Sequence, residues 1–134
     1  MAKRRLARDA CVCTYQALNH SQQALLASEC EAADSGWARM KGLLGRRKEE
    51  FPPGKGLWLV PANSIHTIGM AFPIDVAYLD KKGRVIHMYH SLPPFRVAAI
   101  KFKTHSILEL PAGTLARTRT EVGDIFEFRR LPEG

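Results

Sequence analysis

The sequence has no apolar run near the roughly 20 residues that a membrane-spanning helix needs; its longest runs have the length of a strand. Its basic start, MAKRRLARDACVCTYQ, lacks the continuous apolar core of about 7–15 residues that follows the charged start of a secretory signal. We therefore expect no membrane partner, no export and a cytoplasmic location.

Cysteine is scarce, since only Cys11, Cys13 and Cys30 are present. An odd set of three is no disulfide framework and fits a reducing compartment. If residues 11–18 form a strand, Cys11 and Cys13 share a face, and a thiolate metal site with Cys30 as third ligand is conceivable. No second close pair of ligands completes a zinc set, so we interpret the thiols as packing groups and expect no metal and no cofactor.

Catalytic signatures are also lacking. There is no G-x-S-x-G, no zinc-protease helix motif and no glycine-rich loop leading into a helix. The histidines His66, His87, His90 and His105 have no spacing diagnostic of a metal site. The sequence gives no positive support for an enzyme, and no catalytic residue can be assigned.

What is present fits one soluble domain. The chain has 134 residues, of which 46% are hydrophobic and 25% charged. We expect a basic, flexible tail at 1–10, a single β domain at 11–130 and a short tail at 131–134. Of the net charge of +7, the first nine residues carry four basic groups against Asp9, or +3, which leaves +4 for the rest. The tail could bind nucleic acid as an accessory function, although no aromatic-rich basic stripe supports this.

Seven segments have the β-branched and aromatic content or the alternation of strands. A polar turn, NHSQQ, predicts a first hairpin, and KKG, with Gly83 at a position that needs positive φ, predicts another. The proline-containing segment 92–97 is extended and should cross an edge or rim. The expected strands are 11–18, 24–33, 56–62, 69–80, 84–90, 106–113 and 124–130.

One helix is expected at 36–46, GWARMKGLLGR, capped by Asp34 or Ser35, because its apolar residues recur at spacings of three and four. Residues 114–123 have room for one helical turn. The pattern predicts a mainly β fold, a compact jelly-roll-like sandwich or barrel of about seven short strands with one covering helix.

Six motifs occur in a recognisable order: RMKGLLGR (39–46), GKGLWLVP (54–61), IHTIGMAFPIDVAYLDKKGRVI (65–86), LPPFRV (92–97), ILELPAGT (107–114) and VGD (122–124). In this order and spacing the chain resembles the bacterial and archaeal family called domain of unknown function 192, over about residues 24–128.

The resemblance implies a jelly-roll-like or barrel-like β fold and brings no established activity. Many relatives carry an export signal or lipoprotein anchor, which is not found here. Many also have an aromatic-Trp-Met-Lys-Asn-Thr segment where this chain has IHTIGM, so His66 stands where Trp is common. The IHT-x-GM form is similar to that of a cytoplasmic branch, and a Trp-dependent binding surface does not carry over.

Two acidic residues lie inside expected strands. Both faces of the segment around Asp75 are apolar, so its buried carboxylate needs backbone N–H donors, a basic partner or a proton. Arg39 is the candidate partner. The structural interpretation is that Asp75 fastens a helix or loop to the sheet; the functional one is that it binds a ligand or acts as a base. The same structural and functional interpretations apply to Glu109. We expect it to pair with an exposed Lys or Arg across the sheet.

His66 lies in a turn, where an accessible imidazole suits contact with a ligand. Met70, together with Thr67, Trp58 and Phe72, could form an apolar wall around it, or simply part of the core. The leading hypothesis is a non-enzymatic domain that binds a small molecule or peptide. The alternative is a hydrolase-like enzyme that uses His66 with Asp75 or Glu109. The candidate binding residues are His66, Met70, Asp75, Arg96, Arg39 and Glu109.

Overall fold

The computed structural model describes residues 13–33 and 43–132. Within them the chain forms seven strands, a short 3-10 turn and one short α-helix. The strands are β1 (Cys13–Asn19), β2 (Ala24–Ala33), β3 (Lys55–Leu59), β4 (Ile74–Leu79), β5 (Val85–Leu92), β6 (Ser106–Pro111) and β7 (Phe126–Arg130). The helical elements are η1 (Lys48–Glu50) and α3 (Thr114–Arg117).

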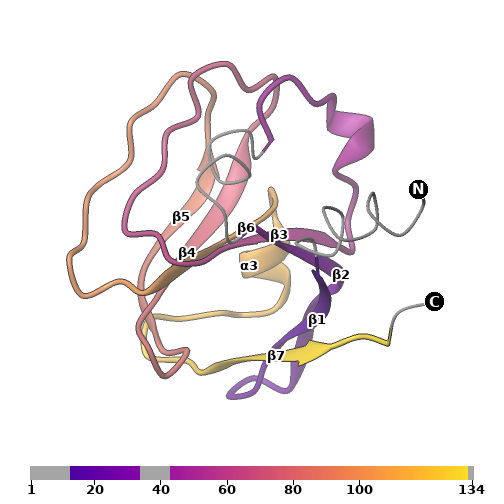
Figure 1. The fold of residues 1–134 in the computed structure, drawn as a ribbon, viewed down its shortest axis with the longest axis vertical. Coiled ribbons are helices and arrows are strands. Elements are labelled where there is room, and N and C mark those ends of the chain that lie inside the picture. Colours follow the sequence, from indigo (N-terminus) through magenta and orange to yellow (C-terminus); the bar gives the residue numbers. More distant parts are fainter. Residues whose placement is uncertain (1–12, 34–42, 133–134) are drawn as a thin grey trace, which may run out of the picture.

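All seven strands belong to one sheet in the order β5-β4-β6-β3-β2-β1-β7. The sheet is mixed, because β2 and β3 run parallel while the other neighbouring strands are antiparallel. The sheet curls so that its two edge strands meet at one end (Figure 1). There the N–H of Val85 donates to the carbonyl of Asp124, and that of Phe126 to the carbonyl of Gly83, both at 2.8 Å. The result is a half-barrel.

This confirms a mainly β fold with seven strands, in its barrel-like form. The single curled sheet differs from a sandwich of two sheets, and nothing in its strand order establishes a jelly roll. The expected helical turn after β6 is α3, which buries Leu115. The helix expected at 36–46 lies mainly outside the described residues; its last part, 43–45, is a turn.

The two expected hairpins are confirmed as β1–β2 and β4–β5. The strand expected at 69–80 begins only at Ile74. Gly69 has a φ of 89°, which a strand does not use, and Pro73 has no N–H for a ladder, so the strand starts after both. Residues 93–96 lie outside the strands, as expected for the proline-containing segment.

The central strands are buried on both faces. Along β4, Ile74, Val76 and Tyr78 belong to one hydrophobic core, and Ala77 and Leu79 to a second core on the other face. Burial of every β4 residue agrees with the apolar pattern of its sequence. No helix among the described residues is long and apolar enough to cross a membrane.

Candidate functional site

Asp75 is fully buried on β4, and backbone N–H groups from three places surround its carboxylate. One oxygen accepts from Ser91 at 2.8 Å. The other accepts from Gly113 at 3.1 Å and Leu115 at 2.8 Å. Charge-assisted bonds of this kind are about twice as strong as neutral ones, so they compensate the buried charge. Of the alternatives weighed from the sequence, backbone donors are the one observed, and Arg39 lies outside the described residues.

These three bonds fasten β4 to the end of β5, to the loop after β6 and to α3. Both oxygens are occupied, and the group has no exposed surface. A carboxylate held this way has no free lone pair directed at solvent with which to accept a substrate proton. The contacts of Asp75 therefore support its structural interpretation.

A pocket of about 440 Å³ opens beside the loop that Asp75 holds. We call it the proline pocket. Its walls come from three separate segments: the loop before β3, the residues just before β4, and the end of β6. It is lined by Lys48, Glu49, Phe51, Pro52, Pro53, Phe72, Pro73, Pro111 and Ala112.

Most of the lining residues carry rings, joined by the methyl group of Ala112 and the side chains of Lys48 and Glu49. The aromatic rings of Phe51 and Phe72 lie 6.0 Å apart between centroids, tilted by 32°. The four prolines have no N–H and fixed φ angles, so their segments offer few donors and cannot readily collapse into the space. A preformed, mainly apolar hollow of this volume falls within the range of small-ligand sites.

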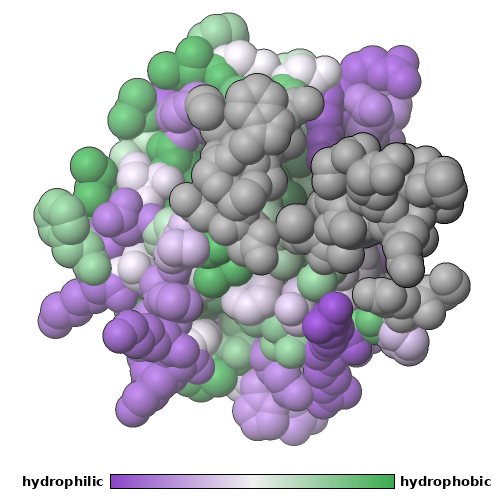
Figure 2. Space-filling model, viewed as in Figure 1, coloured by the Kyte–Doolittle hydropathy of each residue, from purple (hydrophilic) through white to green (hydrophobic). Residues whose placement is uncertain are grey.

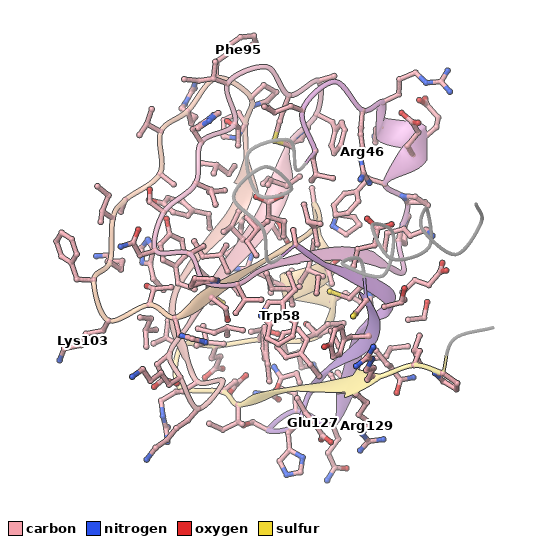
Figure 3. The ribbon with its side chains drawn as sticks, in the orientation of Figure 1. Arg46, Trp58, Phe95, Lys103, Glu127 and Arg129 are labelled. Atoms are coloured by element: carbon pink, nitrogen blue, oxygen red, sulfur yellow. The ribbon has the colours of Figure 1, made fainter. Side chains whose placement is uncertain are left out.

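Glu109, on β6, is 5% exposed. Its cross-strand neighbours are Leu57 on β3 and Val76 on β4, so the basic partner expected across the sheet is not at that register. Burial raises the pKa of Glu109 to about 8, against the opposing effect of the Arg46 guanidinium. The carboxyl is therefore mainly protonated at neutral pH. Arg46, which is labelled in Figure 3, places its Nη2 3.5 Å from Oε1 of Glu31 on β2.

Asp75 and Glu109 lie on opposite faces of the sheet. Val76 is paired with Glu109, and Asp75, the residue before Val76 on β4, points the other way. Asp75 bonds to Leu115, which belongs to the second core, whereas Val76 belongs to the first. The two carboxyl groups thus do not form one site.

His66 and Arg96 are brought together on two loops that pair with each other. His66 forms an antiparallel bridge with Val97, and the N–H of Thr67 donates to the carbonyl of Arg96 at 2.8 Å. Both His66 and Arg96 are exposed, whereas Met70 is buried in the first core. The imidazole Nδ1 accepts the N–H of Ile68 at 3.3 Å. Among the described residues, no hydrogen bond or ion pair joins His66 to either carboxyl group.

The apolar wall expected around His66 is divided by the sheet. Met70 and Phe72 lie in the first core, whereas Trp58 packs against the second, stacked on Phe128 at 3.9 Å and edge-on to Tyr15. Trp58 therefore supports the interior of the half-barrel (Figure 3).

The described cysteines do not form a metal cluster. Cys30 is buried, and burial raises the pKa of its thiol to about 12, which keeps it protonated and supports packing as its role. Cys11 lies outside the described residues. The ranges 13–33 and 43–132 contain no group of three or more His, Cys, Asp or Glu that could hold a metal ion.

The proline pocket was missed in the sequence, although a signal exists. FPP (51–53), FP (72–73) and PA (111–112) flank strand ends. Because β6 is antiparallel to both β3 and β4, the end of β6 lies beside the starts of the other two. The pairing of strands distant in sequence was the missing information.

Comparison with known proteins gives a family and a fold. The model of the domain of unknown function 192 family, described as "Uncharacterized ACR", matches residues 17–128. No protein with a curated description is significantly similar in sequence.

Two solved structures have a similar fold. A protein of unknown function from Novosphingobium aromaticivorans is 20% identical with a TM-score of 0.71, over 87% of this chain and 84% of that one. A putative transcription regulator from Sinorhizobium meliloti is also 20% identical, with a TM-score of 0.73, over 87% of this chain and 93% of that one. At this identity the likeness establishes the fold alone.

Proposed function

The chain belongs to the domain of unknown function 192 family, whose description assigns no activity, and from its own geometry we propose that it is a non-enzymatic binding domain for small ligands that carry an aromatic ring. The observation that carries this proposal is the proline pocket, a hollow of about 440 Å³ walled by Phe51, Phe72 and four prolines.

The chemistry of the walls favours a flat, apolar group. Aromatic rings pair with other rings in tilted or offset geometries, and such pairs add about 0.5–1.5 kcal/mol beyond the apolar area they bury. The proline segments offer few hydrogen-bond donors, so a polar ligand would find few replacements for the water that it loses. The exposed Lys48 and Glu49 at the rim carry opposite charges and select neither an anion nor a cation.

The surrounding fold keeps the pocket open. Ala112 lies between Pro111 and Gly113, and the N–H of Gly113 is fixed by the Asp75 carboxylate at 3.1 Å. The wall at the end of β6 is thereby attached to β4, whose first residues follow Phe72 and Pro73. Asp75 acts in this proposal as a residue that positions the wall, without contacting the ligand.

The alternatives from the sequence have less support. A hydrolase needs its acid and base within reach of each other. Among the described residues, no hydrogen bond or ion pair joins His66 to a carboxyl group. The accessory nucleic-acid function depends on the basic residues at 1–9, outside the described ranges. A cytoplasmic location stays a prediction from the cysteine content.

Ligand-observed NMR on the full chain tests the proposal, with indole and benzyl alcohol as probes and cyclohexanol as a non-aromatic comparison. We expect saturable binding of indole with a Kd near or below about 1 mM, a modest affinity for so small a molecule. Ala112→Leu, which extends an exposed side chain into the pocket, should abolish the signal. Ala116→Leu makes the same change on the exposed face of α3 and should leave it unchanged.

Two outcomes would contradict the proposal. Indole that gives no saturable signal with the wild-type protein excludes an aromatic-ring site. Binding that survives Ala112→Leu places the ligand somewhere other than the proline pocket.

A further inference from the structure

A second surface lies away from the proline pocket and shares no residue with it. Residues 62–68 and 95–105 run side by side outside the sheet, and we call this pair of loops the outer ribbon (Figure 1). Backbone bonds connect it along its length: Phe95 to Thr67 (3.0 Å), Ala98 to Ile65 (3.0 Å), Lys101 to Asn63 (3.1 Å) and Ala62 to His105 (3.0 Å), each N–H to carbonyl.

The outer ribbon is also fastened to the sheet. The Tyr78 hydroxyl donates to the carbonyl of Ala99 at 2.6 Å, and the N–H of Ala99 donates to the Tyr89 hydroxyl at 2.9 Å. At its other end, the buried Thr67 hydroxyl donates to the carbonyl of Pro93 at 2.7 Å and accepts the N–H of Arg96 at 2.8 Å. The backbone is thus held in one shape, and its outward side chains are presented by a fixed scaffold.

Those outward side chains are unusually apolar. Five of the seven large hydrophobic side chains exposed in the described residues lie on the outer ribbon, and Phe102 is 86% exposed. Figure 2 shows apolar side chains along the margin where the ribbon runs, with hydrophilic ones beside them. Exposed apolar groups gathered on one surface mark an interaction site. The five are Ile68, Phe95, Val97, Ile100 and Phe102.

The charge between these apolar groups is of one sign. Arg96, Lys101 and Lys103 are exposed, and residues 93–105 contain no Asp or Glu. Phe95 and Lys103 stand near opposite ends of the loop (Figure 3). A hollow of about 510 Å³ adjoins the Phe102 end and is mainly basic. It is lined by Asp80, Lys81, Lys82, Arg84, Phe102, Lys103, Thr104 and His105.

The single carboxylate in that hollow, Asp80, offsets only part of its positive charge, because four basic side chains line the same hollow. One oxygen of Asp80 accepts the backbone N–H groups of Lys82 and Arg84, each at 2.9 Å, and so serves the turn between β4 and β5. The side chains of Lys81 and Lys82 are exposed, and neither takes part in an ion pair among the described residues.

We propose that the outer ribbon docks onto the surface of an anionic phospholipid bilayer. Its exposed phenylalanine and aliphatic side chains enter the boundary between headgroups and acyl chains, while the lysines beside them contact headgroup phosphates. Docking from the surface needs no membrane-spanning helix, so it is compatible with the absence of long apolar runs. The proposal differs from the expectation of no membrane partner, which considered only helices that span a bilayer.

The mixture of side chains favours a bilayer over a nucleic acid. Single strands bind proteins through bases stacked on aromatic rings, and three of the five exposed side chains, Ile68, Val97 and Ile100, are aliphatic and give no such stacking. A bilayer accepts aromatic and aliphatic groups alike, and its anionic headgroups complement Lys101 and Lys103.

Vesicle co-sedimentation with the full chain tests this proposal. We expect binding to vesicles of phosphatidylcholine with about a third phosphatidylglycerol, weaker binding at high salt, and little binding to phosphatidylcholine alone. Phe95→Ser with Phe102→Ser should lower the partition coefficient about tenfold or more without altering any charge. Val122→Ser, at an exposed apolar residue elsewhere, is the matched control. All three residues are exposed, so circular dichroism should show unchanged folding.

Each other outcome overturns the proposal. Full binding by the double phenylalanine variant means that basic groups, including those at the N-terminus, adsorb to the vesicles without insertion. Equal binding to both kinds of vesicle removes the role of the lysines. Absence of binding to anionic vesicles excludes a bilayer as the partner of the outer ribbon. The partner would then be a protein or a nucleic acid.

Discussion

Glu109 is the residue whose protonation should govern how stability depends on pH. Its folded pKa of about 8 lies above the ordinary 4.5, because burial disfavours the charged form. Between these values the folded state holds a proton that the unfolded state has lost. The stability that this proton represents is complete below about pH 4.5 and is lost as the pH rises through about 8.

Glu109→Gln should remove this dependence, since glutamine has a similar shape and no ionisation. At pH 9 we expect the variant to exceed the wild type in free energy of unfolding by a few kcal/mol, because each tenfold change in an acid constant corresponds to about 1.4 kcal/mol. At pH 5 the two should be nearly equal. Urea denaturation at both pH values measures this. Glu121→Gln, at an exposed position, is the control; equal stability of wild type and Glu109→Gln at pH 9 contradicts the prediction.

At the scale of elements, Asp75 connects β4 to β5 and to the loop before α3. Asp75→Asn keeps the shape but replaces one accepting oxygen with an NH₂ group, so at least one buried N–H loses its acceptor. We expect a loss of about 2–4 kcal/mol in the free energy of unfolding, measured by urea denaturation.

Asp80→Asn is the matched control for this change. The two backbone bonds to Asp80 use one oxygen, which asparagine retains, in a turn that is open to water. The cost should stay below about 1 kcal/mol. Equal losses from the two variants would mean that the three amide bonds of Asp75 add nothing beyond those of an ordinary turn.

The elements themselves could mostly be predicted, because short-range patterns specify them. Short, largely apolar runs indicated β4 and β6, and polar or glycine turns indicated both hairpins. We predicted the start of β4 too early because an apolar run indicates a strand. That prediction did not take into account the conformations of Gly69 and Pro73, which exclude both residues from the strand. The partners of Asp75 could not be read at all, because their N–H groups lie 16, 38 and 40 residues away along the chain.

At the scale of the whole molecule, the missing information is how distant strands pair. Because β3, β4 and β6 are neighbours in one half-barrel, the loops before β3 and β4 lie beside the end of β6. This arrangement creates the proline pocket. The same pairing places Glu109 between two apolar neighbours instead of beside a basic one. Sequence periodicity identifies which face of a strand is buried, but it does not identify the neighbouring strand.

The curl of the sheet depends on Gly83, where its two edges meet. Gly83 has a φ of 84°, and a Cβ on it would lie 2.7 Å from the carbonyl oxygen of Phe126. Phe126 is also the residue whose N–H donates to the carbonyl of Gly83 where the two edges meet. Gly83→Ala should therefore force the edges apart as well as strain the turn, at a cost of roughly 3 kcal/mol or more in the free energy of unfolding.

Gly123→Ala separates these two effects. Gly123 also has positive φ, at 102°, but a Cβ there meets nothing within 4 Å. Gly123→Ala should lower the free energy of unfolding by only about 1 kcal/mol, which is the cost of the strained backbone conformation alone. Hydrogen exchange should further show faster exchange at the N–H groups of Val85 and Phe126 in Gly83→Ala, because these donors join the two edges. If both variants lose the same stability and keep the same exchange rates, contact between β5 and β7 does not hold the half-barrel in its curl.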